Sequence, residues 1–217
     1  MNDLTMRLET EKDYRAVEEL TREAFWNVYI PGAVEHYFVH KMRSHPDFLP
    51  ELAFVLEKDG RIIGNIMYTK SFLEDEEGNR KEIVSIGPIC IHPEFQRLKL
   101  GKLLIEHSFA EARKLGYDVN INFGNPGNYV SRGFVSCKRK NVCFGVWDNY
   151  PTALLVAELV PGALDGRKWM FLPSDADACC DDTAAVEAFD ALFPVKEKKV
   201  LPSQEEFYIY RNSSVVR

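Results

Sequence analysis

Arg97, Lys99 and Lys102 place three basic side chains in one short stretch, directly before and at the start of a segment with helical spacing. The first N–H groups of a helix have no intrahelical partner, and the helix dipole is positive at that end, so such an end favours phosphate. The formal net charge of the whole chain is -6, and the basic stretch therefore opposes the overall field. The pattern predicts a binding site for a diphosphate.

The segment before this turn, EIVSIGPICI, has the composition of a buried β-strand with an interruption. Residues 83–91 are rich in β-branched side chains, as in the interior of a sheet, yet they contain Gly87 and Pro88. Proline cannot donate to a ladder and glycine weakens one, so we expect a bulge where this strand parts from a neighbour. Free backbone groups near Ile89 and Ile91 would then face a gap that suits an extended amide.

The elements around this strand predict an α/β protein. Helical spacing runs from Leu100 to Leu115, and Gly116 is placed to end that helix. The expected strands are residues 4–10, 51–57, 61–72, 117–123, 134–137 and 152–160, and the expected earlier helices are residues 10–25 and 33–45. The strand at 117–123 should run parallel to the interrupted strand, because a helix crosses between them. This order predicts a mixed sheet covered by helices.

Two motifs in this order resemble those of a known family. The stretch IHPEFQRLKLGKLL is similar to the acetyl-coenzyme A signature of the GNAT superfamily of N-acetyltransferases, Gln/Arg-x-x-Gly-x-Gly/Ala after a split strand. Gln96 and Gly101 match its first and last positions, and Lys99 stands where the family usually has glycine. GNPGNYVSRGF resembles the second family element, in which a tyrosine, here Tyr129, precedes Gly-Phe. Together with VPGAL, these motifs point to the small bacterial YhbS-like branch.

The resemblance implies a GNAT-like fold, with a central mixed, mostly antiparallel sheet, a split strand and flanking helices. It implies transfer of an acetyl group from acetyl-CoA to a primary amine of a small molecule or a peptide N-terminus, with Tyr129 as the general acid toward the leaving thiolate. The aromatic residues between positions 25 and 38 would pack in the core or wall the acceptor pocket. The coenzyme-binding residues implied are Ile89, Cys90, Ile91, Gln96, Arg97, Leu98, Lys99, Leu100, Gly101, Lys102 and Asn125.

The sequence leaves the general base open. In the histone-acetylating branch of the resembled family a carboxylate lies on the split strand, and the equivalent position here is Ser85. Glu82 lies near this position, Glu35, His36 and His92 are more distant candidates, and a water chain to solvent is a further one. The reaction requires no metal, and the sequence shows no convincing cluster of metal ligands. The alternative function is a non-catalytic acyl-CoA-binding regulatory module, whereas a nucleotide-binding enzyme is disfavoured because G-x-x-x-x-G-K-[ST] and G-x-G-x-x-G are both missing.

Composition and length bound the remaining possibilities. The chain has 217 residues, which suits one domain, and we expect an acetyltransferase core at 1–160 with a C-terminal extension at 161–217 packed on it. Within the extension, residues 181–193 have helical spacing, Ser203 and Glu206 resemble a capping box, and FYIY at 207–210 predicts a last strand.

The location and partners follow from the same composition. The five cysteines lack C-x-x-C spacing and are expected to be reduced thiols. No apolar run is long enough to span a membrane, and the N-terminal stretch lacks the apolar segment of a signal peptide, so the cytoplasm is expected. The acidic balance argues against a nucleic-acid partner. The oligomeric state is left open by the sequence.

Overall fold

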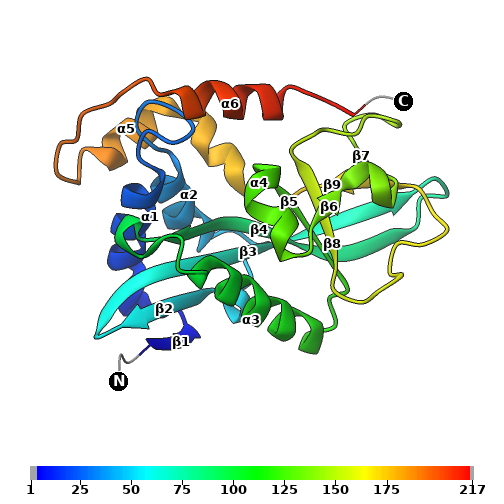
Figure 1. The fold of residues 1–217 in the computed structure, drawn as a ribbon, viewed down its shortest axis with the longest axis horizontal. Coiled ribbons are helices and arrows are strands. Elements are labelled where there is room, and N and C mark those ends of the chain that lie inside the picture. Colours follow the sequence, from blue (N-terminus) through cyan, green and yellow to red (C-terminus); the bar gives the residue numbers. More distant parts are fainter. Residues whose placement is uncertain (1–3, 216–217) are drawn as a thin grey trace.

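The computed structural model describes residues 4–215. Within them, nine strands form one sheet in the order β1-β2-β3-β4-β5-β8-β6, and β9 pairs with β3 and β7 (Figure 1). The strands are β1 Leu4–Leu8, β2 Phe54–Lys58, β3 Arg61–Asp75, β4 Arg80–Ile91, β5 Val119–Phe123, β6 Val135–Ser136, β7 Val142–Phe144, β8 Leu154–Glu158 and β9 Trp169–Leu172. The β4–β5 and β7–β9 pairs are parallel and the other pairs are antiparallel. The predicted mixed, mostly antiparallel sheet is thus confirmed.

Helices cover both faces of this sheet (Figure 1). They are α1 Tyr14–Phe25, α2 Glu35–Met42, α3 Leu100–Lys114, α4 Pro126–Tyr129, α5 Thr183–Asp190 and α6 Pro202–Arg211. Because strand side chains alternate between faces, Phe54 and Leu56 of β2 pack in the cluster that contains α3, whereas Val55 packs in the cluster that contains α1 and α2. No helix within residues 4–215 combines the length and apolar character needed to cross a bilayer.

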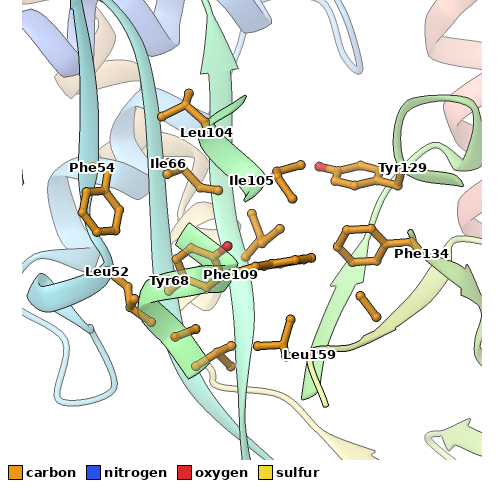
Figure 2. Packing of buried hydrophobic residues seen from close by; sticks show 14 of the residues in the cluster. Leu52, Phe54, Ile66, Tyr68, Leu104, Ile105, Phe109, Tyr129, Phe134 and Leu159 are labelled. Carbon is orange, nitrogen blue, oxygen red and sulfur yellow. The ribbon is translucent and has the colours of Figure 1, made fainter. Parts of the chain in front are cut away.

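The core beneath α3 determines where the predicted catalytic tyrosine lies. Figure 2 shows Ile105 and Phe109 of α3 beside Tyr129 and Phe134, which belong to the segment after β5. The ring of Phe134 lies 5.7 Å from that of Phe109 and 5.2 Å from that of Tyr129. Burial of each such side chain contributes about 1.5–3 kcal/mol. Tyr129 is therefore held by core packing rather than carried on a free loop.

The split in β4 is confirmed. Met67 of β3 opposes both Gly87 and Pro88 of β4, which is a β-bulge with two residues facing one. The ladder between β4 and β5 contains Val84 and Ser85 of β4, and no later residue of β4 pairs with β5 within the described chain. β4 therefore separates from its parallel neighbour over its last residues, as the proline inside the strand predicted.

The C-terminal end of α3 lies at the glycine predicted to end it. Gly116 has φ +93, its N–H donates to the carbonyl of Arg113 at 3.0 Å, and Tyr117 N–H donates to Ala112 at 3.0 Å. These two bonds and the left-handed glycine form a Schellman motif, which satisfies carbonyls at the helix end. Gly116 thus ends α3 as predicted.

The C-terminal segment corrects one prediction. Residues 207–210, expected as a strand, belong to helix α6. Pro202 is at its first turn, a position where the missing N–H of proline is tolerated. The Ser203 hydroxyl donates to the Val28 carbonyl at 2.9 Å instead of capping the helix. The Phe207 ring lies 4.3 Å from that of Tyr29. Phe207 therefore packs against the segment after α1 and is not part of the sheet.

The same segment contacts the rest of the molecule at several places. β9 adds to the sheet beside β3, and neither β9 nor the short β7 was predicted. Arg22 of α1, which is buried, donates to Asp190 of α5 at 2.6 Å. Figure 1 shows α5 near α2, and α6 along the top of the view, running toward the C-terminus. The division between residues 160 and 161 stays a prediction.

Candidate active site

A pocket of about 990 Å³ opens where β4 and β5 separate. One end is lined by the turn before α3 and by the first turn of that helix. The last residues of β4, α1 and α4 also line it. The remaining part, lined by α2, the end of β5, β9 and α6, is called the acceptor end, and it lies away from the basic turn because β9 pairs with the far end of β3 from the residue that faces Ile91. The pocket therefore joins the predicted diphosphate site to the elements expected to hold an acceptor.

The basic turn has an unusual backbone. Arg97 and Lys99 both have φ 63, in the left-handed region. The Lys99 carbonyl accepts the N–H groups of Lys102 at 3.0 Å and Leu103 at 3.1 Å, which starts α3. The N–H groups of the two residues in between have no intrahelical partner. Lys99 thus adopts the conformation for which glycine is suited, and the turn keeps its tight shape without glycine at that position.

Gly101 leaves the helix N-terminus accessible. A Cβ atom built on it would lie 3.4 Å from Nη2 of Arg132 and 3.7 Å from Cγ1 of Ile91, which are ordinary contacts. The protein's own packing therefore does not require glycine here, and the missing side chain instead lets a ligand approach the backbone closely. The Arg132 guanidinium also donates to the Asn128 carbonyl and is a fourth cation at this turn. The side chains of Arg97, Lys99, Lys102 and Arg132, together with the free N–H groups at the start of α3, are called the cradle. Sequence reasoning missed Arg132, although it lies inside the Y-V-S-R-G-F motif.

The open edge of β4 presents backbone groups to the pocket. His92 N–H donates to the Ile63 carbonyl at 2.8 Å, and in an antiparallel ladder the residues that pair in this way alternate. Ile89 and Ile91 consequently direct their N–H and C=O groups away from β3, toward the gap. Gln96 Nε2 donates to the Ile91 carbonyl at 3.0 Å, so Gln96 fixes the turn against the strand and leaves the two N–H groups to a ligand.

Cys90, between these two residues, has a different environment. Its thiol is buried and lies 3.7 Å from the Thr21 hydroxyl of α1. Burial raises the pKa of the Cys90 thiol to about 12, so the thiol stays neutral at physiological pH. Cys90 lines the pocket, and the protonation state of its side chain is unsuited to nucleophilic chemistry.

Tyr129 lines the pocket from α4 and is buried. Its ring lies over Gly124, because a Cβ built there would be only 2.5 Å from Cε2 of Tyr129. Burial raises the pKa of the Tyr129 phenol, and the Asn122 side chain and the charge of Arg132 oppose that rise. The phenol therefore keeps its proton at neutral pH, which is the state that a general acid requires.

The structure separates the candidate bases. Glu35 and Ser85 line the pocket, whereas Glu82 and His92 do not. The Ser85 hydroxyl donates to the Ser71 hydroxyl at 3.0 Å. The Glu82 carboxylate accepts the Tyr117 hydroxyl at 3.2 Å outside the pocket.

Glu35, at the first position of α2, has the properties of a base near neutral pH. Burial raises the pKa of its carboxyl to about 7, although backbone N–H groups including that of Val34, 3.1 Å from Oε2, oppose the rise. Tyr29, Glu35 and Tyr129 all line the pocket. The base candidate and the predicted acid thus belong to the same pocket.

Most of the predicted coenzyme-binding residues line the pocket. Ile89, Cys90, Ile91, Gln96, Arg97, Lys99, Leu100, Gly101 and Lys102 line the pocket. Leu98 does not line it and is 62% exposed. The Asn125 side chain accepts the Gly127 N–H at 2.8 Å as the cap of α4 and does not line the pocket either.

One His–Asp–Asp group lies beside the pocket. His45, Asp47 and Asp175 bring three possible ligand atoms within 4.8 Å of one another. The two ring nitrogens of His45 already have protein partners, with Nδ1 accepting the Asp47 N–H at 3.2 Å and Nε2 lying 3.1 Å from Asp175. We interpret the group as a hydrogen-bonded connection between two loops.

Three solved structures share this fold. YhbS from Escherichia coli, in complex with CoA, has a TM-score of 0.70 at 19% identity, over 82% of this chain and 93% of its own. A GNAT family acetyltransferase from Brucella melitensis, in complex with acetyl-CoA, has a TM-score of 0.62 at 21% identity, over 81% of this chain and 99% of its own. The ribosomal-protein-S18-alanine N-acetyltransferase from Escherichia coli has a TM-score of 0.51 at 16% identity, over 75% and 98%.

No curated protein matches the chain significantly. Residues 16–137, which make up more than half of the chain, match the model of the Acetyltransferase (GNAT) family. That match contains the split strand, the basic turn, α3 and the tyrosine of α4, all of which line the pocket. The chain therefore belongs to the GNAT family of acetyltransferases.

Proposed function

We propose that this protein is an acetyl-CoA-dependent N-acetyltransferase that acts on a primary amine. The observation that carries the proposal is that one pocket at the strand split is lined by the N-terminus of α3 and also by Tyr129 and Glu35. The CoA and acetyl-CoA complexes of the two GNAT structures support the choice of co-substrate.

The residues present fit the diphosphate of acetyl-CoA. Free N–H groups at the start of α3 and the charges of Arg97, Lys99, Lys102 and Arg132 lie at one end of the pocket, and charge-assisted hydrogen bonds of this kind bind phosphate strongly. The absent side chain of Gly101 keeps the backbone within reach. This end of the pocket is accordingly assigned to the diphosphate.

The edge of β4 fits the pantetheine arm. The N–H groups of Ile89 and Ile91 face the gap and would donate to the amide and thioester oxygens of an extended ligand. When bound, acetyl-CoA supplies the acetyl group as a thioester. The protein holds that group beside Tyr129 at the point where β4 and β5 separate.

Tyr129 and Glu35 supply the proton transfers. Glu35 takes a proton from the ammonium form of the acceptor, and the amine nitrogen then forms the new C–N bond at the thioester carbon. Tyr129 gives its phenolic proton to the sulfur as the C–S bond breaks. As the C–S bond breaks, the nitrogen loses its second proton through solvent to the Tyr129 phenolate, and Glu35 returns its proton to solvent. The ammonium has then lost two protons, and the products are the N-acetyl amide, the free thiol of CoA and one released proton.

The test is release of free thiol from acetyl-CoA in the presence of a panel of amines. Thiol release that depends on an amine and yields the N-acetyl product supports the proposal. Binding of acetyl-CoA without release by any amine would instead indicate the non-catalytic acyl-CoA-binding module. The five cysteines are free, which fits a reducing compartment, and we propose that the protein acts in the cytoplasm.

A further inference from the structure

The C-terminal segment builds much of the pocket end that lies away from the basic turn. The lining residues of this segment are Phe171 of β9, Pro173 and Ser174 of the following loop, Asp177 of the 3-10 helix Ala176–Asp181, and Phe207 of α6. All of them lie beyond residues 16–137, which the family model matches. The part of the pocket that would hold the acceptor is therefore partly made by a segment outside the matched family region.

This segment is anchored to β3 and to the loop after α2. The Ser174 hydroxyl donates to Asp47 at 2.8 Å, and the Ser174 N–H donates to the Ser71 hydroxyl at 3.2 Å. Asp175 lies 3.1 Å from His45 Nε2. These contacts tie the loop after β9 to β3 and to the loop after α2, so its side chains have defined positions in the pocket wall.

Aromatic rings form two sides of the acceptor end. The Tyr29 ring lies 5.8 Å from that of Phe25 and 4.3 Å from that of Phe207. The rings of Phe123 and Phe171 lie 6.2 Å apart on the sheet side. All five residues line the pocket. A wall of this kind favours an apolar, and especially an aromatic, ligand body.

The charges along the pocket are separated by sign. The cationic side chains that line it are those of the cradle, whereas its two lining carboxylates, Glu35 and Asp177, are at the acceptor end. They come from adjacent segments, because Cys180, in the same 3-10 helix as Asp177 (Ala176–Asp181), has its Sγ 4.0 Å from the carbonyl of Val34, the residue before Glu35. Burial raises the pKa of the Asp177 carboxyl, and the charge of Arg211, which does not line the pocket, opposes that rise. Asp177, together with Glu35 in the form ionised above its pKa of about 7, thus presents negative charge within an aromatic wall.

We propose that the acceptor is a cationic amine with an apolar or aromatic body and no carboxylate next to the amine, and that Asp177 and Glu35 exclude amino acids by like-charge repulsion. The inference rests on the proposed function and names its substrate class. In a pocket from which water is partly removed, a carboxylate near these two groups is strongly disfavoured, whereas an ammonium group is attracted. Repulsion of ligands that carry a carboxylate would contribute to specificity, as would contact of the ligand body with the aromatic wall.

The test measures binding of three ligands with the same ring by calorimetry, using the full chain saturated with CoA so that no turnover occurs. Phenethylamine is the expected type of acceptor, L-phenylalanine adds a carboxylate, and L-phenylalanine methyl ester adds similar bulk without the charge. We expect phenethylamine and the ester to bind with similar affinity and L-phenylalanine at least about tenfold more weakly, since like charges across an interface are strongly unfavourable.

Variants locate the source of the preference. Asp177→Asn and Glu35→Gln, alone and together, should reduce the discrimination against L-phenylalanine relative to its ester. Asp59→Asn is the matched control, because it removes one negative charge in the β2–β3 turn, where Asp59 has φ 50, and it should leave the discrimination unchanged. Equal binding of phenethylamine and L-phenylalanine, or a preference that survives the double variant, would overturn the inference.

Turnover separates this inference from the proposed function. Thiol release with L-phenylalanine at the rate of phenethylamine would overturn the acceptor class while the acetyltransferase activity stands. The expected binding preference without thiol release from any amine would support the acceptor site and contradict the proposed activity.

Discussion

Tyr129 combines a buried ring with a hydroxyl at the strand split. It packs against Phe134 and Gly124, and its pKa is raised above the ordinary phenol value by burial. A side chain held on several sides needs little reorganisation to donate a proton, and such positioning is what general acid catalysis requires. The proposed role of Tyr129 is therefore to donate its phenolic proton from a ring that packing holds in place.

Tyr129→Phe keeps that ring and removes the proton. We expect turnover to fall by about 10²–10⁴, the range typical of a positioned acid, with the affinity for acetyl-CoA unchanged. Steady-state kinetics and calorimetry measure the two quantities. Unchanged turnover under conditions in which chemistry limits the rate would show that Tyr129 serves only in packing.

Glu35→Gln tests the base. Because the pKa of Glu35 is about 7, the wild-type kcat/KM should fall as the pH drops below 7, by about tenfold per unit once the carboxyl is protonated. The variant should have a lower plateau and lose this dependence near pH 7. Ser85→Ala is the matched control at the other lining candidate and should retain it. Loss of the dependence in Ser85→Ala instead would move the base to Ser85.

Helix α3 and its preceding turn act as one element. Arg97 and Lys99 hold left-handed backbone conformations, which are strained for residues with a Cβ by about 1–2 kcal/mol each. The glycine usual in the resembled family would remove that strain at position 99 but also a positive charge. The charge of Lys99 at the cradle is thus retained together with an unfavourable backbone conformation.

Gly101→Val tests the placement of the diphosphate at α3. The β-branched side chain would cover the helix N-terminus, and we expect a large loss of affinity for acetyl-CoA, by about 10²-fold, which corresponds to two lost charge-assisted hydrogen bonds. The fold should persist, since a Cβ at this position meets only ordinary contacts. Leu103→Val, on the same helix at a position 42% exposed, is the control. Unchanged coenzyme affinity in Gly101→Val would mean that the diphosphate binds elsewhere.

At the scale of the whole molecule, Asp190 of α5 links the C-terminal segment to the core. It accepts from Arg22, whose side chain is 5% exposed, and lies 3.1 Å from His36 Nε2. Asp190→Ala would leave the buried guanidinium unpaired, and the free energy of unfolding should fall by about 3 kcal/mol. Acceptor affinity should fall as well, because α5 precedes α6 in the segment that lines the pocket.

Glu187→Gln is the control for that prediction. Its side chain, on the same helix, is 74% exposed, and surface substitutions of this kind change stability by less than about 0.5 kcal/mol. Denaturant titration measures both variants. A stability of Asp190→Ala equal to that of Glu187→Gln would show that the ion pair does not hold the segment.

The pH dependence of the free energy of unfolding should contain two opposing contributions, one from Glu35 and one from His36. Burial raises the pKa of Glu35 to about 7, so the folded state binds the extra proton and stability from this group increases as the pH falls from 7 to 4.5. Burial lowers the pKa of His36 to about 4, and stability from His36 is lost as the pH falls from 6.5 to 4. The two slopes largely cancel in the wild-type protein.

Glu35→Gln removes one of these slopes. Relative to wild type, the variant should be more stable at pH 8, by up to about 3 kcal/mol at 1.4 kcal/mol per pKa unit, and should lose stability more steeply between pH 6.5 and 4.5. Urea titrations over that range measure the difference. An identical pH dependence in the two proteins would show that Glu35 has an ordinary pKa in the folded state.

The sequence by itself determined the elements whose signals are local. The bulge at Pro88, the end of α3 at Gly116 and the basic turn depend on residues close together in the chain, because proline, left-handed glycine and unpaired helix N–H groups act through neighbouring backbone. Tyr129 was found through its motif rather than through a physical rule. These features were sufficient to predict the turn at which we propose that the diphosphate binds.

The tertiary structure decided which distant residues meet. Arg132 reaches the start of α3, Glu35 loses its surrounding water, and Asp177 and Phe207 enter the pocket only because the chain returns to it after β8. FYIY suits a strand by composition, yet a strand requires a partner edge, and in the folded protein these residues follow Pro202 as a helix over Tyr29. Contacts and desolvation between remote segments have no local signature, so the acceptor end could not be predicted from the sequence.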